Sequence, residues 1–212
     1  MSADARYPEK VERIDAGDRA LIQIVDAALA EAARRSGPWL VCRVGCTECC
    51  MGPFAITPLD ARRLRRGLGE LEAREPERAA QVRERARAYI ARTAAAFPGN
   101  PVTGLLAEDE TGDDRFAGFP DDEPCPALDP STGACDLYDS RPITCRTFGP
   151  PARCGSESLG VCELCYHGAS DEEIAACAVE PDPEGAESTL LDEWEKIAGV
   201  RGQTIVAFPL AG

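Results

Sequence analysis

Histidine, methionine and tryptophan are scarce in this sequence, which has one histidine (His167), two methionines and two tryptophans among 212 residues. A single histidine excludes a metal site built from two cysteines and two histidines, and it gives little support to a cysteine–histidine nucleophile. No hydrophobic run approaches the ~18 residues of a membrane-spanning helix. The first ten residues lack the basic start and apolar core of a secretory signal, so we expect a cytoplasmic protein with no membrane partner.

Cysteine, in contrast, is abundant, with eleven residues. Disulfides are not the expected use in the cytosol, where thiols are kept reduced. An odd number of cysteines also cannot pair completely within one chain. We therefore interpret the cysteines as thiolate ligands of zinc, of iron or of an iron–sulfur cluster, and the sequence leaves the choice among these open.

The charge of the chain is strongly acidic, with a formal net charge of -14 at pH 7. This balance argues against binding to nucleic acid or to an anionic membrane, and we expect neither partner. The segment from Arg62 to Arg92 is an exception, because it holds ten arginines and five glutamates. A mixture of both signs along one helical stretch favours a solvated helix face.

Hydrophobic periodicity predicts a mainly α protein with few short strands and an irregular, cysteine-rich, metal-bound core. We expect a single domain over residues 1–212. Its three parts are an N-terminal helix, a cysteine-cluster core and a C-terminal helical extension, at residues 1–39, 40–165 and 166–212. The core includes helices within 58–97 and an acidic loop over 98–124, for which disorder is the simplest interpretation. Residues 204–208 are expected to form a terminal strand.

Two helix starts carry capping boxes. In the first, Thr57 is followed three residues later by Asp60, and Pro58 occupies the first helical position. In the second, Ser170 is followed by Glu173. We therefore expect one helix to begin just after Thr57 and another just after Ser170.

The cysteines fall into two clusters along the chain. The first cluster consists of Cys42, Cys46, Cys49 and Cys50. The second consists of Cys125, Cys135, Cys145, Cys154, Cys162 and Cys165. Thiolates two or three residues apart on a tight turn can converge on one metal or cluster. The adjacent Cys49 and Cys50 are expected to point different ways, and so to serve two irons or two metals more easily than one. Ten thiols are enough to fill one four-thiolate site and leave ligands for another.

Two arginines in the second cluster, Arg141 and Arg146, are expected to lie beside the bound group. A metal held by four thiolates is anionic and costly to bury, and a guanidinium lowers that cost and can donate hydrogen bonds to the sulfurs. The eleventh cysteine, Cys177, is not expected to be a ligand. It lies three residues after Ile174 on an apolar helix face, and its own helix offers no neighbouring thiol.

At these residues the sequence resembles the YkgJ-like cysteine-cluster family, a zinc- or iron-chelating domain whose hallmark is CxxCxxCC followed by CPxL and CxIYxxRPxxCRxF. The second half matches closely, at Cys125-Pro126-Ala127-Leu128, Cys135-Asp136-Leu137-Tyr138, Arg141-Pro142 and Cys145-Arg146-Thr147-Phe148. The first half has one extra residue, because three residues separate Cys42 from Cys46. The resemblance covers about residues 40–150 and implies metal or iron–sulfur binding rather than a defined reaction. The same motif occurs in flagellin lysine methylases, but no residue here identifies a methylation substrate.

Two other interpretations stay open. The spacing from Cys42 through Cys46 to Cys49 is that of the four-iron cluster in radical S-adenosylmethionine enzymes. Against this, Glu48 stands where those enzymes favour an aromatic residue, and the chain lacks the alternating strands and helices of their barrel. A structural zinc module for partner binding is the other interpretation, with the cysteine pairs Cys46/Cys49 and Cys162/Cys165 as ligands.

The leading hypothesis is a protein that holds zinc, iron or an iron–sulfur cluster through cysteine thiolates. Redox activity and a protein redox or assembly partner are further expectations. No catalytic constellation beyond the metal site identifies the chain as an enzyme, and no glycine-rich phosphate loop is present.

Overall fold

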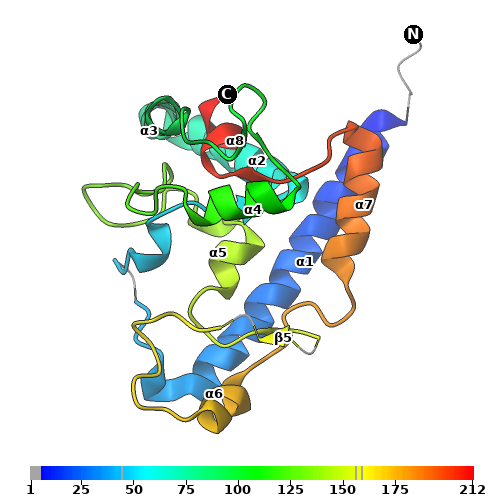
Figure 1. Cartoon of the computed structure of the whole chain (residues 1–212). Helices are drawn as coiled ribbons and strands as arrows, with labels where there is room; N and C mark the ends of the chain where they lie inside the picture. Colours follow the sequence, from blue (N-terminus) through cyan, green and yellow to red (C-terminus); the bar gives the residue numbers. More distant parts are fainter. Residues whose placement is uncertain (1–5, 44, 156, 159) are drawn as a thin grey trace. The chain divides into compact units, whose positions relative to one another are not determined.

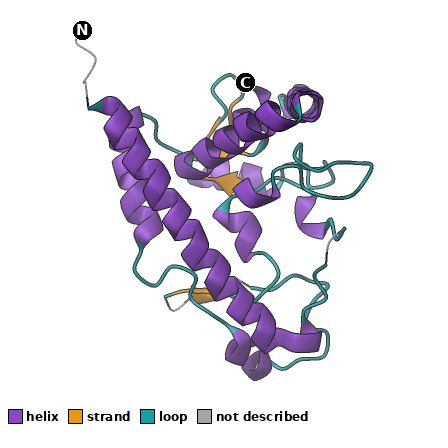
Figure 2. Ribbon diagram, turned by 180° about the vertical axis from the view of Figure 1, so that it is seen from behind, coloured by secondary structure: helices purple, strands orange, loops and turns teal. Residues whose placement is uncertain are grey.

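The computed structural model describes residues 6–43, 45–155, 157–158 and 160–212, and its contacts divide the chain into two compact units. The two units comprise residues 1–43 with 143–200 (unit 1) and residues 44–142 with 201–212 (unit 2). Helices, 3-10 turns included, make up 55% of the described residues and the strands are short, which confirms the predicted mainly α class (Figure 1, Figure 2). Among the described helices, none combines the length and the apolar character needed to cross a membrane. The single domain over 1–212 stays a prediction.

Unit 1 is organised around α1 (Tyr7–Ser36), a helix of 30 residues. Its buried residues recur three or four positions apart and so share one face; they are Ile14, Asp18, Leu21, Val25, Leu29, Ala32 and Ser36. Helix α1 contacts α7 (Ala186–Ala198), α5 (Ile143–Thr147) and α6 (Asp171–Cys177). Figure 1 shows α7 alongside α1. Ser170 begins α6 with the predicted capping box.

Short elements complete unit 1. The 3-10 turn η1 (Gly37–Trp39) follows α1, and β4 (Arg153–Cys154) pairs antiparallel with β5 (Glu157–Ser158). Arg146 of α5 is buried and donates to both carboxylate oxygens of Asp26 on α1, at 2.6 and 2.8 Å. This ion pair fixes α5 to α1 and gives the Arg146 charge a partner within unit 1.

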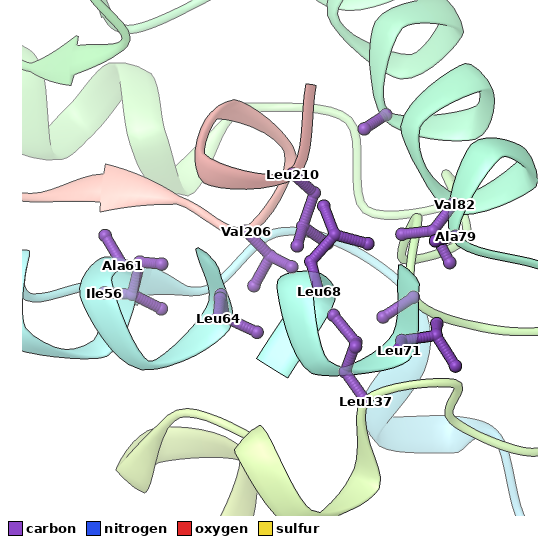
Figure 3. Packing of buried hydrophobic residues seen from close by; sticks show 12 residues of the cluster. Ile56, Ala61, Leu64, Leu68, Leu71, Ala79, Val82, Leu137, Val206 and Leu210 are labelled. Atoms are coloured by element: carbon purple, nitrogen blue, oxygen red, sulfur yellow. The ribbon is translucent and has the colours of Figure 1, made fainter. Parts of the chain in front are cut away.

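Unit 2 is built on α2 (Pro58–Arg74) and α3 (Pro76–Thr93), which pack against each other and against the C-terminal helix α8 (Ala207–Ala211). The predicted capping box at Thr57 is confirmed, because its side chain accepts from the Asp60 N–H and the Asp60 carboxylate accepts from the Thr57 N–H. Figure 3 shows the core that results, in which side chains of α2 and α3 meet Val206 and Leu210.

The C-terminal segment differs from the prediction of a strand over 204–208. Only β6 (Thr204–Ile205) is a strand, and it pairs antiparallel with β1 (Ala55–Ile56). The chain then turns into α8, whose Leu210 is fully buried in the core of α2 and α3. The apolar residues from 207 onward are thus buried as part of a short helix rather than as part of a strand.

The acidic segment 98–124 is ordered in the described residues, so the interpretation as a disordered loop is wrong. It contains the hairpin of β2 (Gly99–Asn100) with β3 (Leu105–Leu106) and the helix α4 (Glu110–Ala117). Aromatic side chains supply its core: Phe119 contacts Phe97 edge to face with ring centres 6.0 Å apart. A few aromatic contacts therefore outweigh an acidic composition, because each ring buries a large apolar area.

Close approach at Gly67 of α2 gives a test of this fold. A methyl group there would lie 2.2 Å from Oγ and 2.4 Å from Cβ of Ser140, the last residue of the 3-10 turn η3 (Tyr138–Ser140). Because a serine side chain is too short to move away, Gly67→Ala should lower the free energy of unfolding by about 1–3 kcal/mol. Urea denaturation measures the change.

The matched control is Gly69→Ala in the same helix, where an added methyl meets no atom within 4 Å. We expect this substitution to raise the free energy of unfolding by about 0.5–1 kcal/mol, because alanine is the better helix former. Equal effects at the two glycines would contradict the packing of η3 on α2.

Candidate metal centre

Two short antiparallel pairings bring cysteine-bearing segments of unit 2 side by side. In the first, the backbone N–H of Cys125 donates to the carbonyl oxygen of Cys50 at 2.7 Å. In the second, Leu128 pairs with Cys135. Cys50 and Cys125, which lie 75 residues apart in the sequence, are thus carried on adjacent stretches of backbone. The side chains of Cys125 and Cys135 also pack against the core formed by α2 and α3.

Cys49 and Cys50 occupy the 3-10 turn η2 (Glu48–Cys50). Their thiols lie close enough to hydrogen-bond to each other. This hydrogen bond, together with burial, raises the pKa of Cys49, and the nearby charge of Arg141 opposes the rise. Whether the two thiols serve one metal or two stays a prediction.

Arg141 acts on thiols from two segments of the chain. Burial raises the pKa of the Cys135 thiol, and the Arg141 charge opposes this rise as it does for Cys49. The guanidinium lies over the ring of Tyr138, 3.6 Å from its centre, and Nε donates to the Tyr138 carbonyl oxygen at 3.0 Å. These contacts hold the side chain in place beside the thiols.

A buried ion pair in α2 fixes the backbone at Arg141. Arg63 Nη1 and Asp60 Oδ1 are 2.5 Å apart, and both side chains are only 1% exposed. The same nitrogen of Arg63 lies 3.4 Å from the carbonyl oxygen of Arg141 and donates to it. Asp60 also forms the capping box with Thr57 at the start of α2. The same carboxylate therefore caps α2 and, through Arg63, helps to position Arg141.

Three arginines of α3 hold the segment that carries Cys125 and Cys135. They lie seven residues apart, which is close to two helical turns, and are Arg78, Arg85 and Arg92. Arg85 donates to the carbonyl oxygen of Pro126 at 2.9 Å and to Asp136 Oδ2 at 2.5 Å, and Arg78 donates to Asp136 Oδ1 at 2.5 Å. Arg92 binds Glu123 at 2.7 Å and lowers the pKa of that carboxyl. The expected solvated face is thus kept at Arg92, whose side chain is 51% exposed, while Arg85, at 25%, is more covered.

Tyr89, also on α3, is a candidate that the sequence analysis missed. Its hydroxyl is buried and has no hydrogen-bond partner among the described residues. Burial, with the charges of Glu123 and Cys125, raises its pKa to about 12. An orphaned donor whose surroundings include a thiol is a feature that a bound thiolate would satisfy.

Asp136 gives a prediction about how this region is held. Its carboxylate is 1% exposed and binds both Arg78 and Arg85. Asp136→Asn removes the charge but keeps the shape, and we expect the free energy of unfolding to fall by about 1–3 kcal/mol because two guanidiniums lose their partner. Urea denaturation gives the loss, and hydrogen exchange should show faster opening of residues 125–136. Asp122→Asn, at an exposed position nearby in the sequence, is the control and should change neither; the same loss in both variants would contradict this role.

The remaining cysteines belong to unit 1, and they are Cys42, Cys145, Cys154, Cys162, Cys165 and Cys177. Cys42 and Cys154 are exposed. Cys162 and Cys165 are buried in one cluster with Cys177, so the fold gives Cys177 the thiol neighbours that its own helix lacks. The predicted ligands are thus divided, with Cys46, Cys49, Cys50, Cys125 and Cys135 in unit 2.

In the described part of the chain, no three cysteine, histidine, aspartate or glutamate side chains are arranged to hold a metal ion as they stand. The donor chemistry of unit 2 nevertheless fits a thiolate-bound metal. Backbone pairings bring thiol-bearing segments side by side, and the charge of Arg141 acts on the thiols of Cys49 and Cys135. The buried Tyr89 hydroxyl, near Cys125, has no hydrogen-bond partner among the described residues.

Comparison with protein families decides where the chain belongs. A family model matches residues 41–165, and its description is CxxCxxCC, a putative zinc- or iron-chelating domain. The chain belongs to the CxxCxxCC family. The matched range includes both pairings that bring the unit 2 thiols together and ends at Cys165. No curated protein and no solved structure matches the chain.

Proposed function

We propose that this CxxCxxCC protein binds zinc or iron through the thiols of unit 2. The five thiols of this group are those of Cys46, Cys49, Cys50, Cys125 and Cys135. The proposal is based on two backbone contacts. One joins the segments of Cys50 and Cys125, and the other joins the segments of Leu128 and Cys135. Membership of a zinc- or iron-chelating family supports the same conclusion.

Binding in this group would deprotonate thiols and draw them together. A cysteine side chain reaches a new position by rotation about one bond, which costs little compared with the free energy of metal–thiolate binding. The positive charge of Arg141 would offset the negative charge of the thiolates, and the Tyr89 hydroxyl would donate to the Cys125 sulfur. A bound zinc ion supplies structural cross-linking, whereas an iron–sulfur cluster would supply electron transfer.

The identity of the metal is decided by protein purified without oxygen and analysed for iron, zinc and acid-labile sulfide. A brown protein that contains sulfide and is bleached by dithionite would establish an iron–sulfur cluster, and with it a redox role and a need for an electron-transfer partner. A colourless protein with stoichiometric zinc would establish a chelating or structural site. A folded protein that binds neither metal would overturn the proposal.

Substitution of single thiols tests the ligand set. Cys49→Ser, Cys125→Ser and Cys135→Ser should each lower the metal content of the purified chain, because a hydroxyl is a poor donor to zinc and iron. Cys154→Ser is the matched control, since Cys154 is exposed and belongs to unit 1. Elemental analysis per chain gives the result. If Cys154→Ser lowers the metal content as much as the other three substitutions do, the assignment of the ligands to unit 2 is refuted.

Arg141→Ala tests the guanidinium beside the thiols. We expect the affinity for the bound metal to fall by about 10–100-fold, as is usual when a group that supports metal ligands is removed. If the metal is an iron–sulfur cluster, its reduction potential should also become more negative, because a nearby positive charge favours the reduced form. Arg74→Ala at the end of α2 is the control. An unchanged affinity would remove Arg141 from the site while leaving the thiols in it.

A further inference from the structure

A groove in unit 2 opens beside the corner where α2 ends and α3 begins. Its volume is about 520 Å³, and it is lined by residues 75–78, Gln81, Asp129 and Ser131. Sites of this size hold small organic molecules, whereas a single metal ion needs far less space. The groove contains no cysteine, so it is separate from the thiols proposed above to bind zinc or iron.

Hydrogen bonds hold both walls of the groove in place. Arg78, on the α3 wall, donates to Oδ1 of Asp136 at 2.5 Å and so ties the helix to the segment that follows the other wall. That wall is the loop of residues 129–133. The Gly133 N–H donates to the Asp129 carbonyl oxygen at 2.9 Å, and the Asp129 N–H donates to the Ala134 carbonyl oxygen at 2.8 Å. The groove is thus formed in advance, which lowers the free-energy cost of binding a ligand.

The side chains of the groove carry an excess of negative charge. Three carboxylates, those of Glu75, Glu77 and Asp129, line it together with one guanidinium, that of Arg78. The Arg78 charge is already paired inside the chain, because its guanidinium binds the buried Asp136 carboxylate at 2.5 Å and the Glu75 carboxylate at 3.4 Å. A positively charged organic ligand therefore fits the groove.

Asp129 stays ionised across the physiological pH range. Its carboxylate accepts hydrogen bonds from the Ser131 N–H at 2.9 Å, from the Ser131 hydroxyl at 2.7 Å and from the Thr132 hydroxyl at 2.8 Å. These hydrogen bonds lower the pKa of Asp129 to about 2. The loop thus presents a permanent negative charge in a fixed position.

Two polar side chains on the α3 wall have no partner within the described part of the chain. Glu77 and Gln81 stand about one turn apart on α3, and no other described residue forms a hydrogen bond or an ion pair with either side chain. The carboxylate and the amide oxygen are both acceptors. Together with Asp129 they offer three acceptor groups to one ligand.

We propose that this groove binds a guanidinium group, carried by an arginine side chain of a partner protein or by a small guanidino compound. Binding there requires none of the thiols, so it is independent of the function proposed above. The net charge of the chain, -14, attracts cations from solution toward such a site.

The arrangement of the acceptors favours guanidinium over ammonium. Glu77 and Asp129 belong to different walls of the groove, α3 and the loop. A planar guanidinium donates in several directions and can bridge two carboxylates, whereas an ammonium is a compact, strongly hydrated charge. An arginine side chain should therefore bind more tightly than a lysine side chain.

The site is tested by titration of the full-length chain with N-acetyl-arginine amide, followed by the NMR shifts of the backbone N–H groups. We expect saturable shifts centred on residues 75–81 and 129–133. Glu77→Gln and Asp129→Asn should each weaken binding by about tenfold or more, because each removes a charge-assisted hydrogen bond. Glu70→Gln is the matched control and should leave the affinity unchanged, since this carboxylate of α2 is 64% exposed and does not line the groove. Circular dichroism confirms that each variant is folded.

Three further probes identify the ligand. N-acetyl-lysine amide should bind more weakly than the arginine amide. Methylguanidine carries the guanidinium alone, and equal affinity for it supports a small guanidino compound. Tighter binding of a tripeptide with arginine at its centre supports a partner protein.

The proposal is wrong if the arginine amide causes no saturable shifts. It is equally wrong if Glu77→Gln and Asp129→Asn bind the amide as tightly as Glu70→Gln does, or if the lysine amide or Ca²⁺ binds in the groove as tightly as the arginine amide.

Discussion

The candidate centre depends on the ion pairs that the buried Asp136 carboxylate forms with Arg78 and Arg85 of α3. The segment from Cys125 to Cys135 has few apolar side chains, so hydrophobic burial alone cannot fix it on the helices. A carboxylate with two guanidinium partners supplies directional, charge-assisted hydrogen bonds instead. Because Arg85 also binds the carbonyl oxygen of Pro126, one side chain positions the backbone next to both cysteines.

The same principle operates at the start of α2. Asp60 caps the helix through Thr57, pairs with Arg63, and through it fixes the carbonyl oxygen of Arg141. Burial of an ion pair is costly, but removal of one partner costs more, so such pairs restrict the chain to one arrangement. The arginine that faces Cys49 and Cys135 is thereby connected to the helix core through backbone and side-chain contacts rather than left on a free loop.

Thiols are sorted by the fold into two environments. Those of unit 2 lie among charged and polar groups that can neutralise a thiolate cluster, whereas Cys162, Cys165 and Cys177 lie among aromatic and aliphatic side chains. A polar environment suits a site of high negative charge, whereas an apolar environment keeps buried thiols uncharged.

The sequence alone determined the features that depend on local chemistry. The capping boxes at Thr57 and Ser170 and the mainly helical class follow from residues close together in the chain. The family membership follows from cysteine motifs that can be read directly in the sequence. The seven-residue spacing of the α3 arginines was also visible, but their partners were not, because Glu123 and Asp136 are 31 to 58 residues from the arginines that bind them.

Only the tertiary structure decided which thiols are neighbours and which charges are buried. Sequence spacing separates Cys50 from Cys125 and Cys165 from Cys177, and the pairing of backbone segments or the packing of α6 brings each pair into one environment. The acidic segment 98–124 shows the same limit, since its order comes from aromatic contacts with distant residues. Propensity acts over a few residues, whereas burial and ion pairing depend on chain segments that meet only in the folded state.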